Sequence, residues 1–207
     1  MSRILVLVRH GESTGNLANS FTGWRDLDLT ERGRLQAQAV AQRLLIRNIP
    51  FAKVFTSNLQ RTRHSAEITL EALGRKDLPI IADAALNERD YGDLTGLDKD
   101  EARRRWGNDQ VQRWRRSYEH APPGGESLRD TVARVLPYFL RHILPCVMRG
   151  DPTLVVAHGN SLRALIMALD GLTPAQISEF ELQTGETLIY ELADDTTVQK
   201  RDVFSVP

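Results

Sequence analysis

The fold is decided by the stretch Ile4-Leu5-Val6-Leu7-Val8-Arg9-His10-Gly11-Glu12-Ser13-Thr14-Gly15-Asn16. Five apolar residues in succession, 4–8, are typical of a strand that is buried on both faces of a sheet. The polar residues from Arg9 onward therefore begin where the strand ends, at an edge of the sheet. Ligands bind at that edge in open α/β sheets. Arg9, His10 and Gly11 are thus candidate ligand-binding residues, and the glycine would let the backbone approach a ligand closely.

A second buried strand is predicted at 153–157, where Thr-Leu-Val-Val-Ala leads directly into His158-Gly159-Asn160. If the two strands are parallel neighbours, His10 and His158 face each other across one crevice. The helix that begins near Asn160 would point its N-terminus at the same place. A simpler interpretation is that both histidines cap strand ends and bond to nearby backbone. That interpretation does not explain why the strand–His–Gly pattern occurs twice, or why Arg9 adjoins the first histidine.

Composition excludes several classes of partner and site. Lys plus Arg and Asp plus Glu each number 27 among 207 residues, so no overall charge attracts nucleic acid or an acidic membrane. A phosphate site must then be built locally. Cys146 is the only cysteine in the sequence, which rules out a disulfide framework or a cysteine metal site within the chain.

The chain 1–207 is predicted to form a single domain, because it has no linker, no repeat and no long run of charge. Its apolar runs are too short for a signal peptide or a transmembrane helix, which predicts a cytoplasmic protein. Alternating strands and helices predict an α/β fold, a three-layer α/β/α sandwich with a mainly parallel central sheet. Strands are expected at 4–8, 52–57, 79–82, 153–157, 187–192 and 196–203, and helices after Thr30, at 59–73, after Ser127, at 161–169 and after Thr173.

The helix expected at 128–143 carries an apolar face that includes Leu140. Pro137 and Pro145 fall inside this helical pattern, and proline interrupts the hydrogen bonds of a helix interior. The helix should therefore be kinked or divided. The helix after Thr30 has an apolar face of the same kind, which extends to Leu45.

Arg61 lies in the first turn of the helix at 59–73, where a cation is unfavourable beside the positive end of the helix dipole. Residues that break such a rule tend to mark function, so Arg61 is a candidate phosphate contact. The alternative is a solvated arginine. Within the polar loop 87–97, Glu88 and Tyr91 are the side chains able to do chemistry, although a glutamate in a loop is usually a solvated charge.

Residues 99–119 form a locally basic stretch with seven cations against four acids, interleaved with Trp106, Trp114 and Tyr118. On pattern alone this stretch favours nucleic-acid binding. The neutral net charge and the two histidines instead favour a small phosphorylated ligand.

Phosphoryl transfer fits this set of residues, because it needs a nucleophile, positive charge on the non-bridging oxygens and an acid for the leaving oxygen. Neutral His10 can attack phosphorus in line, and Arg9 and Arg61 offer forked donors that match phosphate geometry. His158, if protonated, adds charge, and Glu88 can exchange a proton with the substrate hydroxyl. No metal is expected, since there is no His-x-x-x-His and no pair of acids near either histidine.

The motifs of the chain resemble those of a known enzyme family. They are Leu7-Val8-Arg9-His10-Gly11-Glu12-Ser13 with Asn16, Phe21-Thr22-Gly23-Trp24, Leu86-Asn87-Glu88-Arg89 with Tyr91-Gly92, Trp114-Arg115-Arg116, and the run from Ala157 to Leu165. Arg-His-Gly by itself is typical of the histidine phosphatase superfamily. The full set resembles the cofactor-dependent phosphoglycerate mutases within that superfamily, from about residue 3 to about residue 203.

The resemblance implies a glycolytic and gluconeogenic interconversion of 2-phosphoglycerate and 3-phosphoglycerate through a phosphohistidine, primed by the cofactor 2,3-bisphosphoglycerate and without metal. It implies that His10 is the nucleophile, Glu88 the acid and base, and His158 the stabiliser of the transferring phosphoryl group. The implied phosphate-binding and pocket residues are Arg9, Ser13, Asn16, Thr22, Gly23, Arg61, Gly159 and Asn160. The implied contacts of the substrate carboxylate and second phosphate are Tyr91, Lys99, Arg115 and Arg116.

The implied partners are small phosphorylated three-carbon acids, with no nucleic acid and no membrane, and a homo-oligomer is compatible with the sequence. The chain departs from longer members of the family, since 117–125 is only a short turn and their C-terminal tail is missing. Closure of the pocket and oligomer contacts are therefore left without a prediction.

Two alternatives to a mutase stay open. One is a histidine phosphatase that hydrolyses small phosphate monoesters, and the other is a binding module without turnover. Lys99, Arg115 and Arg116 favour the mutase, because a plain phosphatase does not need them. A binding module would have lost a catalytic position, and the sequence retains all of them.

Overall fold

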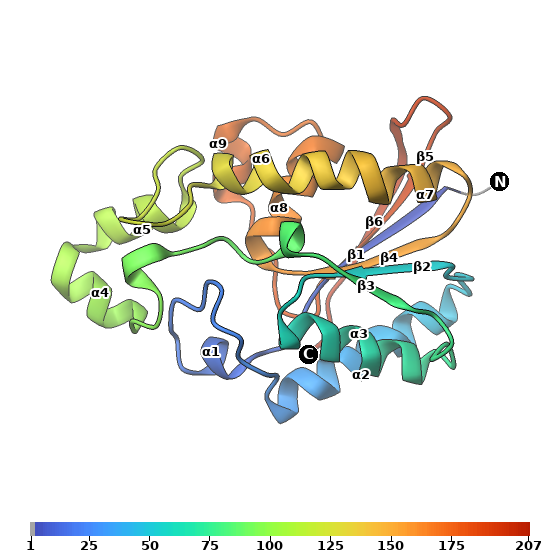
Figure 1. Ribbon diagram of the computed structural model, residues 1–207, viewed down its shortest axis with the longest axis horizontal. Coiled ribbons are helices and arrows are strands. Elements are labelled where there is room, and N and C mark those ends of the chain that lie inside the picture. Colours follow the sequence, from blue (N-terminus) through green and yellow to red (C-terminus); the bar gives the residue numbers. More distant parts are fainter. Residues whose placement is uncertain (1–2) are drawn as a thin grey trace.

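The computed structural model describes residues 3–207 and shows a six-stranded sheet with the strand order β3-β2-β4-β1-β5-β6 (Figure 1). β5 runs antiparallel to both of its neighbours, and the other strands share one direction. The prediction of a mainly parallel sheet is therefore confirmed. The strands are β1 (Ile4–Arg9), β2 (Lys53–Thr56), β3 (Ile80–Ala82), β4 (Thr153–Ala157), β5 (Thr187–Leu192) and β6 (Val198–Phe204).

β1 and β4 are parallel neighbours at the centre of the sheet, which is the arrangement that His10 and His158 need in order to face each other. Arg9 pairs with Ala157 at the end of the shared ladder, and the His10 N–H donates to the Ala157 carbonyl at 3.0 Å. His10 and His158 are consequently the first residues after the two strands, and they lie side by side at the same edge of the sheet. The two imidazole rings lie edge to face with their centroids 5.0 Å apart.

Helices cover both faces of the sheet and complete the predicted three-layer α/β/α arrangement (Figure 1). Among residues 3–207, no helix combines the length and the apolar character needed to cross a membrane. One face is covered by α2 (Glu31–Ile46) and α3 (Gln60–Ala72), with the short α1 (Thr14–Leu17) nearby. The other face is covered by α6 (Leu128–Tyr138), α7 (Leu144–Met148), α8 (Gly159–Leu169) and α9 (Pro174–Glu179). Two further helices, α4 (Lys99–Trp106) and α5 (Asn108–Arg116), lie beyond the strand ends.

The core consists of two apolar layers that meet at β1. Leu5 and Leu7 pack with side chains from α6, α7 and α8, whereas Val6 and Val8 pack with side chains from α2 and α3. All four are at most 3% exposed. Alternate residues of a strand point to opposite faces, so a continuous apolar run is what a central strand requires.

The helical segment after Ser127 is divided, as its prolines predicted. A π-helical turn at Phe139–Ile143 separates α6 from α7, and Pro145 stands in the first turn of α7. Proline lacks an N–H and its ring clashes with the carbonyl four residues earlier, and a widened turn accommodates both effects. The predicted burial of Leu140 and Leu45 is wrong, since they are 51% and 50% exposed. Leu140 lies in the widened turn, where the helical spacing no longer applies.

A smaller apolar cluster holds α4 and α5 against the loop that carries Tyr91. Phe21, Leu94, Ala102 and Val111 are its buried members, and Trp106 and Trp114 pack against them. This cluster fixes the start of α4 and the end of α5 near the edge of the sheet. α4 and α5, which carry the basic stretch 99–119, therefore lie beyond the ends of β1 and β4 (Figure 1).

Candidate active site

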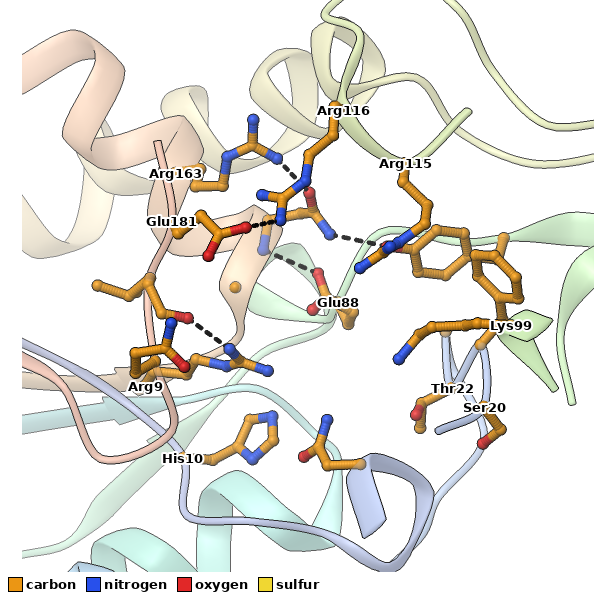
Figure 2. A pocket seen from close by; sticks show the side chains of 18 of the residues that line it. Arg9, His10, Ser20, Thr22, Glu88, Lys99, Arg115, Arg116, Arg163 and Glu181 are labelled. Carbon is orange, nitrogen blue, oxygen red and sulfur yellow. Dashed lines mark hydrogen bonds and ion pairs between the residues drawn. The ribbon is translucent and has the colours of Figure 1, made fainter. Parts of the chain in front are cut away.

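A pocket of about 290 Å³ opens at the edge where β1 and β4 end (Figure 2). Most of the predicted site residues meet there, although they come from segments far apart in the sequence. Ser13 and His158 do not line the pocket. The predicted residues that line it are Arg9, His10, Asn16, Thr22, Gly23, Arg61, Glu88, Tyr91, Lys99, Arg115, Arg116, Gly159 and Asn160.

His10 is held as a neutral imidazole with one free nitrogen. Its Nδ1 lies 2.6 Å from the Gly11 carbonyl, and a carbonyl can only accept, so Nδ1 carries the proton and Nε2 keeps its lone pair. Burial, followed by the charges of Arg61 and Arg9, holds the pKa of His10 well below its ordinary value of 6.5. An unprotonated Nε2 beside two guanidinium groups is suited to attack on phosphorus.

Gly11 has a different role from the one predicted. It does not line the pocket, so it does not bring the backbone close to a ligand. A Cβ at Gly11 would lie 2.1 Å from the carbonyl oxygen of Gly33 in α2. The glycine is required because two backbone segments cross there, and this crossing supports the position of His10.

His158 and Arg61 form a buried unit behind His10. The Arg61 Nε donates to His158 Nδ1 at 3.2 Å, and His158 Nε2 lies 2.8 Å from the Ser57 hydroxyl. Burial, with the charges of Arg61 and then His10, holds the pKa of His158 well below 6.5. His158 therefore does not reach the pocket itself, and it acts on the pocket by holding the Arg61 guanidinium.

Arg61 is 1% exposed, and burial lowers its pKa to about 10, so it stays charged at neutral pH. Its terminal nitrogens donate to the carbonyls of Arg25 and Gly23 at 2.8 and 3.0 Å. A guanidinium has five N–H donors, which leaves two for a ligand. Arg61 therefore fixes the loop around Gly23 and also presents positive charge to the pocket; the solvated alternative is excluded.

We expect both active-site histidines to be neutral at pH 7. Their buried environment disfavours the charged form, so the pKa of each lies below 6.5. An NMR titration of the imidazole C2 protons, assigned with His10→Asn and His158→Asn, measures this directly and requires no substrate. A titration midpoint of about 6.5 or above for either histidine would contradict the arrangement described here.

Glu88 accepts hydrogen bonds from the start of α8. Its Oε1 receives the backbone N–H of Asn160 at 3.0 Å and that of Arg89 at 2.8 Å. The N-terminus of α8 therefore binds a protein carboxylate at this point, where the sequence predicted a phosphate. Oε2 of Glu88 lies towards Gly159, and the Arg9 guanidinium lies on the same side. Glu88 thus faces the pocket on the side where Arg9 lies (Figure 2).

Ser13 acts on Asn16 rather than on the pocket surface. It is fully buried and caps α1, and its hydroxyl lies 2.9 Å from the Asn16 Oδ1. The Ser13 backbone N–H donates to the same oxygen at 3.0 Å. These bonds turn the amide nitrogen of Asn16 towards the pocket that it lines.

The far end of the pocket is strongly basic. Lys99, Arg115 and Arg116 lie there, and burial lowers the pKa of both Lys99 and Arg115, with neighbouring cations adding to the effect. Arg116 forms an ion pair with Glu181, which belongs to the segment between α9 and β5 (Figure 2). Six cationic side chains and two carboxylates line the pocket, so it holds an excess of four positive charges when its histidine is neutral.

The sequence did not predict a functional role for Arg163, Arg89 or Glu181. Arg163 lines the pocket and is 4% exposed. It follows Gly159 by four residues on α8, so helical spacing could have placed it on the same face. Arg89 is fully buried beside Glu88. Glu181 lies in an irregular segment whose sequence carries no comparable signal.

Within the described part of the chain, 3–207, no group of three or more His, Cys, Asp or Glu side chains is arranged to hold a metal ion. The donors around the pocket are mainly guanidinium groups, an ammonium group and amides. Such donors suit phosphate and carboxylate oxygens.

A family model and the sequences of similar proteins assign the chain to the same family. The model of the histidine phosphatase superfamily (branch 1) matches residues 5–202. A 2,3-bisphosphoglycerate-dependent phosphoglycerate mutase of Methylobacterium sp. strain 4-46 is 62% identical over 203 residues, 98% of each chain. The protein of that name from Beijerinckia indica is 56% identical over 206 residues, which is 100% of each chain.

Solved structures with the same fold are more distant in sequence. A mycobacterial glucosyl-3-phosphoglycerate phosphatase in complex with VO3 superposes with a TM-score of 0.82 at 27% identity, covering 99% of this chain and 100% of that one. Bacillus stearothermophilus YhfR superposes with a TM-score of 0.79 at 29% identity, covering 95% and 94%. The chain belongs to the histidine phosphatase superfamily and, within it, to the family of the 2,3-bisphosphoglycerate-dependent phosphoglycerate mutases.

Proposed function

We propose that the protein interconverts 2-phosphoglycerate and 3-phosphoglycerate through a phosphohistidine at His10, primed by 2,3-bisphosphoglycerate. One observation carries the proposal: neutral His10 lies on one side of a pocket, and Lys99, Arg115 and Arg116 lie across the pocket from it (Figure 2). A ligand with two phosphates and a carboxylate carries roughly four to five negative charges at neutral pH. The excess of four positive charges in the lining suits such a ligand.

When bound, 2,3-bisphosphoglycerate supplies the phosphoryl group that His10 then carries on Nε2. The phosphoryl group passes from His10 to the free hydroxyl of phosphoglycerate, so the P–N bond breaks and a P–O bond forms. Glu88 takes the proton of that hydroxyl. In the return step the other phosphoryl group moves to His10 Nε2, and Glu88 gives its proton to the oxygen that leaves.

The remaining residues stabilise charge and hold the ligand. Arg9 and Arg61 neutralise the non-bridging oxygens of the group in transfer, and His158 holds the Arg61 guanidinium through the 3.2 Å bond. Asn16, Thr22, Gly23, Gly159 and Asn160 line the pocket. We assign the carboxylate and the second phosphate of the ligand to Tyr91, Lys99, Arg115 and Arg116, which line the same pocket.

A phosphatase of the same superfamily is the second candidate, since a structural neighbour at 27% identity is a glucosyl-3-phosphoglycerate phosphatase. The fold therefore does not separate the two activities. Relatives that are 56–62% identical along almost the whole chain carry the mutase name. A phosphatase also has no need for three cations remote from its nucleophile.

A coupled assay distinguishes the two candidates. With 3-phosphoglycerate as substrate, we expect 2-phosphoglycerate to form, slowly in dialysed enzyme and much faster after catalytic amounts of 2,3-bisphosphoglycerate are added. Release of inorganic phosphate should be far slower than isomerisation. Phosphate release that matches or exceeds isomerisation would identify a phosphatase instead.

We expect turnover to be independent of metal ions. Guanidinium groups in this pocket can neutralise the negative charge of the phosphoryl oxygens. In other phosphotransferases a metal ion neutralises that charge. Activity should survive dialysis against EDTA, and vanadate should inhibit by mimicking five-coordinate phosphorus. Loss of activity on chelation that zinc or manganese restores would refute this prediction.

The proposal extends to the setting of the enzyme. We infer that 1–207 act as one catalytic domain in the cytoplasm, on small phosphorylated three-carbon acids. Size-exclusion chromatography with light scattering measures whether a homo-oligomer forms, and fractionation of cells measures the location.

A further inference from the structure

Arg163 determines how the amide of Asn160 is oriented. Its Nη1 donates to the Asn160 Oδ1 at 2.9 Å, and its Nη2 donates to the Ile177 carbonyl. A guanidinium group has donors and no acceptor, so the oxygen of the Asn160 amide must face Arg163. The amide nitrogen of Asn160 is thereby turned the other way, towards Tyr91.

The oxygen of Tyr91 receives two hydrogen bonds in consequence. The Asn160 Nδ2 donates to it at 3.3 Å, and the Nη2 of Arg89 donates to it at 3.2 Å. Both neighbours are donors, so neither can accept the phenolic hydrogen. In the described residues 3–207 no protein acceptor lies within bonding distance of that hydrogen, and Tyr91 lines the pocket. The Tyr91 O–H is left to point into the pocket.

We propose that Arg163 is a positioning residue, which fixes the direction of the hydrogen bonds from itself through Asn160 to Tyr91 so that the Tyr91 O–H is donated to an oxyanion of the bound substrate. The inference rests on the proposed function for the identity of that substrate. It assigns Arg163 a role without direct contact with the reacting atoms.

Arg89 reinforces this direction from the opposite side. It is fully buried, its Cζ lies 4.8 Å from the centre of the Tyr91 ring, and its Nη2 also donates to the Arg115 carbonyl at 2.6 Å. Burial by itself would raise the pKa of Tyr91, but the charge of Arg89 and the two donated bonds lower it overall. A more acidic phenol is a stronger donor. Burial lowers the pKa of Arg163 to about 10, so this guanidinium is charged at neutral pH.

The chain of bonds has a consequence for ligand choice. A group that presents only acceptors, such as a carboxylate or a phosphate, satisfies the Tyr91 O–H fully. An amide nitrogen or an ammonium group at that position would face a donor and would be rejected. Tyr91 therefore selects for negative charge at the end of the ligand remote from His10.

Two substitutions test the direction of the bonds. Asn160→Asp keeps the shape of the side chain, but its carboxylate accepts on both sides, so the Tyr91 O–H turns away from the pocket. Arg163→Met removes the donor that orients the amide. We expect both to weaken binding of 3-phosphoglycerate about tenfold and to raise the pKa of Tyr91. The pKa is measured from tyrosinate absorbance in the ultraviolet, as the difference from the same variant with Tyr91→Phe.

A double-mutant cycle separates positioning from general support of the fold. If Arg163 acts through Tyr91, Arg163→Met should weaken binding little further once Tyr91→Phe is present. Arg163→Lys keeps a donor and should restore most of the affinity. Arg75→Met is the matched control, because Arg75 also donates to a backbone carbonyl, that of Phe51, and does not line the pocket. Calorimetric titration in a His10→Asn background measures binding without turnover.

Additive losses in the cycle, or an unchanged pKa of Tyr91 in a folded Arg163→Met protein, would overturn the inference. Absence of mutase activity in the unaltered enzyme would instead refute the proposed function. The pKa comparison involves no substrate, so an unchanged pKa would overturn the inference about Arg163 whatever the outcome for the proposed function.

Discussion

His10→Ala should abolish the phosphoenzyme and lower kcat/KM for 3-phosphoglycerate by about four orders of magnitude or more. The reason is geometric. His10 Nε2 is the free imidazole nitrogen on the pocket surface, and the neutral His158 is fully buried with both of its nitrogens bonded. No cysteine lines the pocket to replace the lost nucleophile, since Cys146 packs in the core.

The phosphoenzyme is measured by incubation with labelled 2,3-bisphosphoglycerate and denaturation. The adduct should be labile in acid and stable in base, as a phosphohistidine is, and it should be missing from His10→Ala. His64→Ala is the matched control, because His64 lies on α3, outside the pocket, and bonds to Asp28. Label on a serine, or label retained in His10→Ala, would exclude His10 as the nucleophile.

Arg116→Ala should lower mutase turnover about ten- to a hundredfold and lower hydrolysis of phosphorylated His10 much less. A mutase must retain the bisphosphorylated intermediate while the ligand turns over, so that its other phosphate meets His10. A hydrogen bond to a charged group contributes about 1.5–3 kcal/mol, and losing one speeds escape of the ligand accordingly. The ratio of mutase to phosphatase activity, measured in the same preparation, should fall.

Glu181→Gln is the informative control for Arg116. Glu181 pairs with Arg116 in the ligand-free protein, so this substitution removes the partner and leaves the guanidinium available to substrate. We expect mutase turnover to be maintained in Glu181→Gln. If Arg116→Ala instead reduces both activities in proportion, Arg116 supports the general phosphate site, and the preference for a mutase loses its main support from this structure.

The parts of the fold that sequence could predict are those set by local pattern. An apolar run such as 4–8 has a single good environment, the centre of a sheet, and the two His-Gly pairs follow two such runs. Gly74 and Ser127 likewise end and begin helices through local rules, a positive φ at one and a capping hydroxyl at the other. Local pattern did not predict which strands are neighbours, and the convergence of the pocket residues depends on β1 and β4 lying side by side.

The parts that sequence could not predict depend on contacts between distant segments. The partner of Arg116 is Glu181, 65 residues away. The role of Gly11 depends on Gly33 crossing beside it, and no pattern within 9–16 reveals that contact. His158 was expected at the pocket surface, but its bonds to Ser57 and Arg61 are long-range and draw it behind His10. Side-chain partnerships of this kind become visible only when the chain is folded.

The position of β1 also constrains how the protein can be made. β1 is synthesised first among the described strands, yet its two partners in the sheet are 153–157 and 187–191. Sequence separation of this size slows folding, and an apolar strand without partners is a site for aggregation. A nascent chain that has reached residue 150 displays Ile4–Val8 with neither edge paired. Folding on the ribosome must therefore wait for most of the chain, and chaperones that shield a short apolar segment are expected to improve the yield.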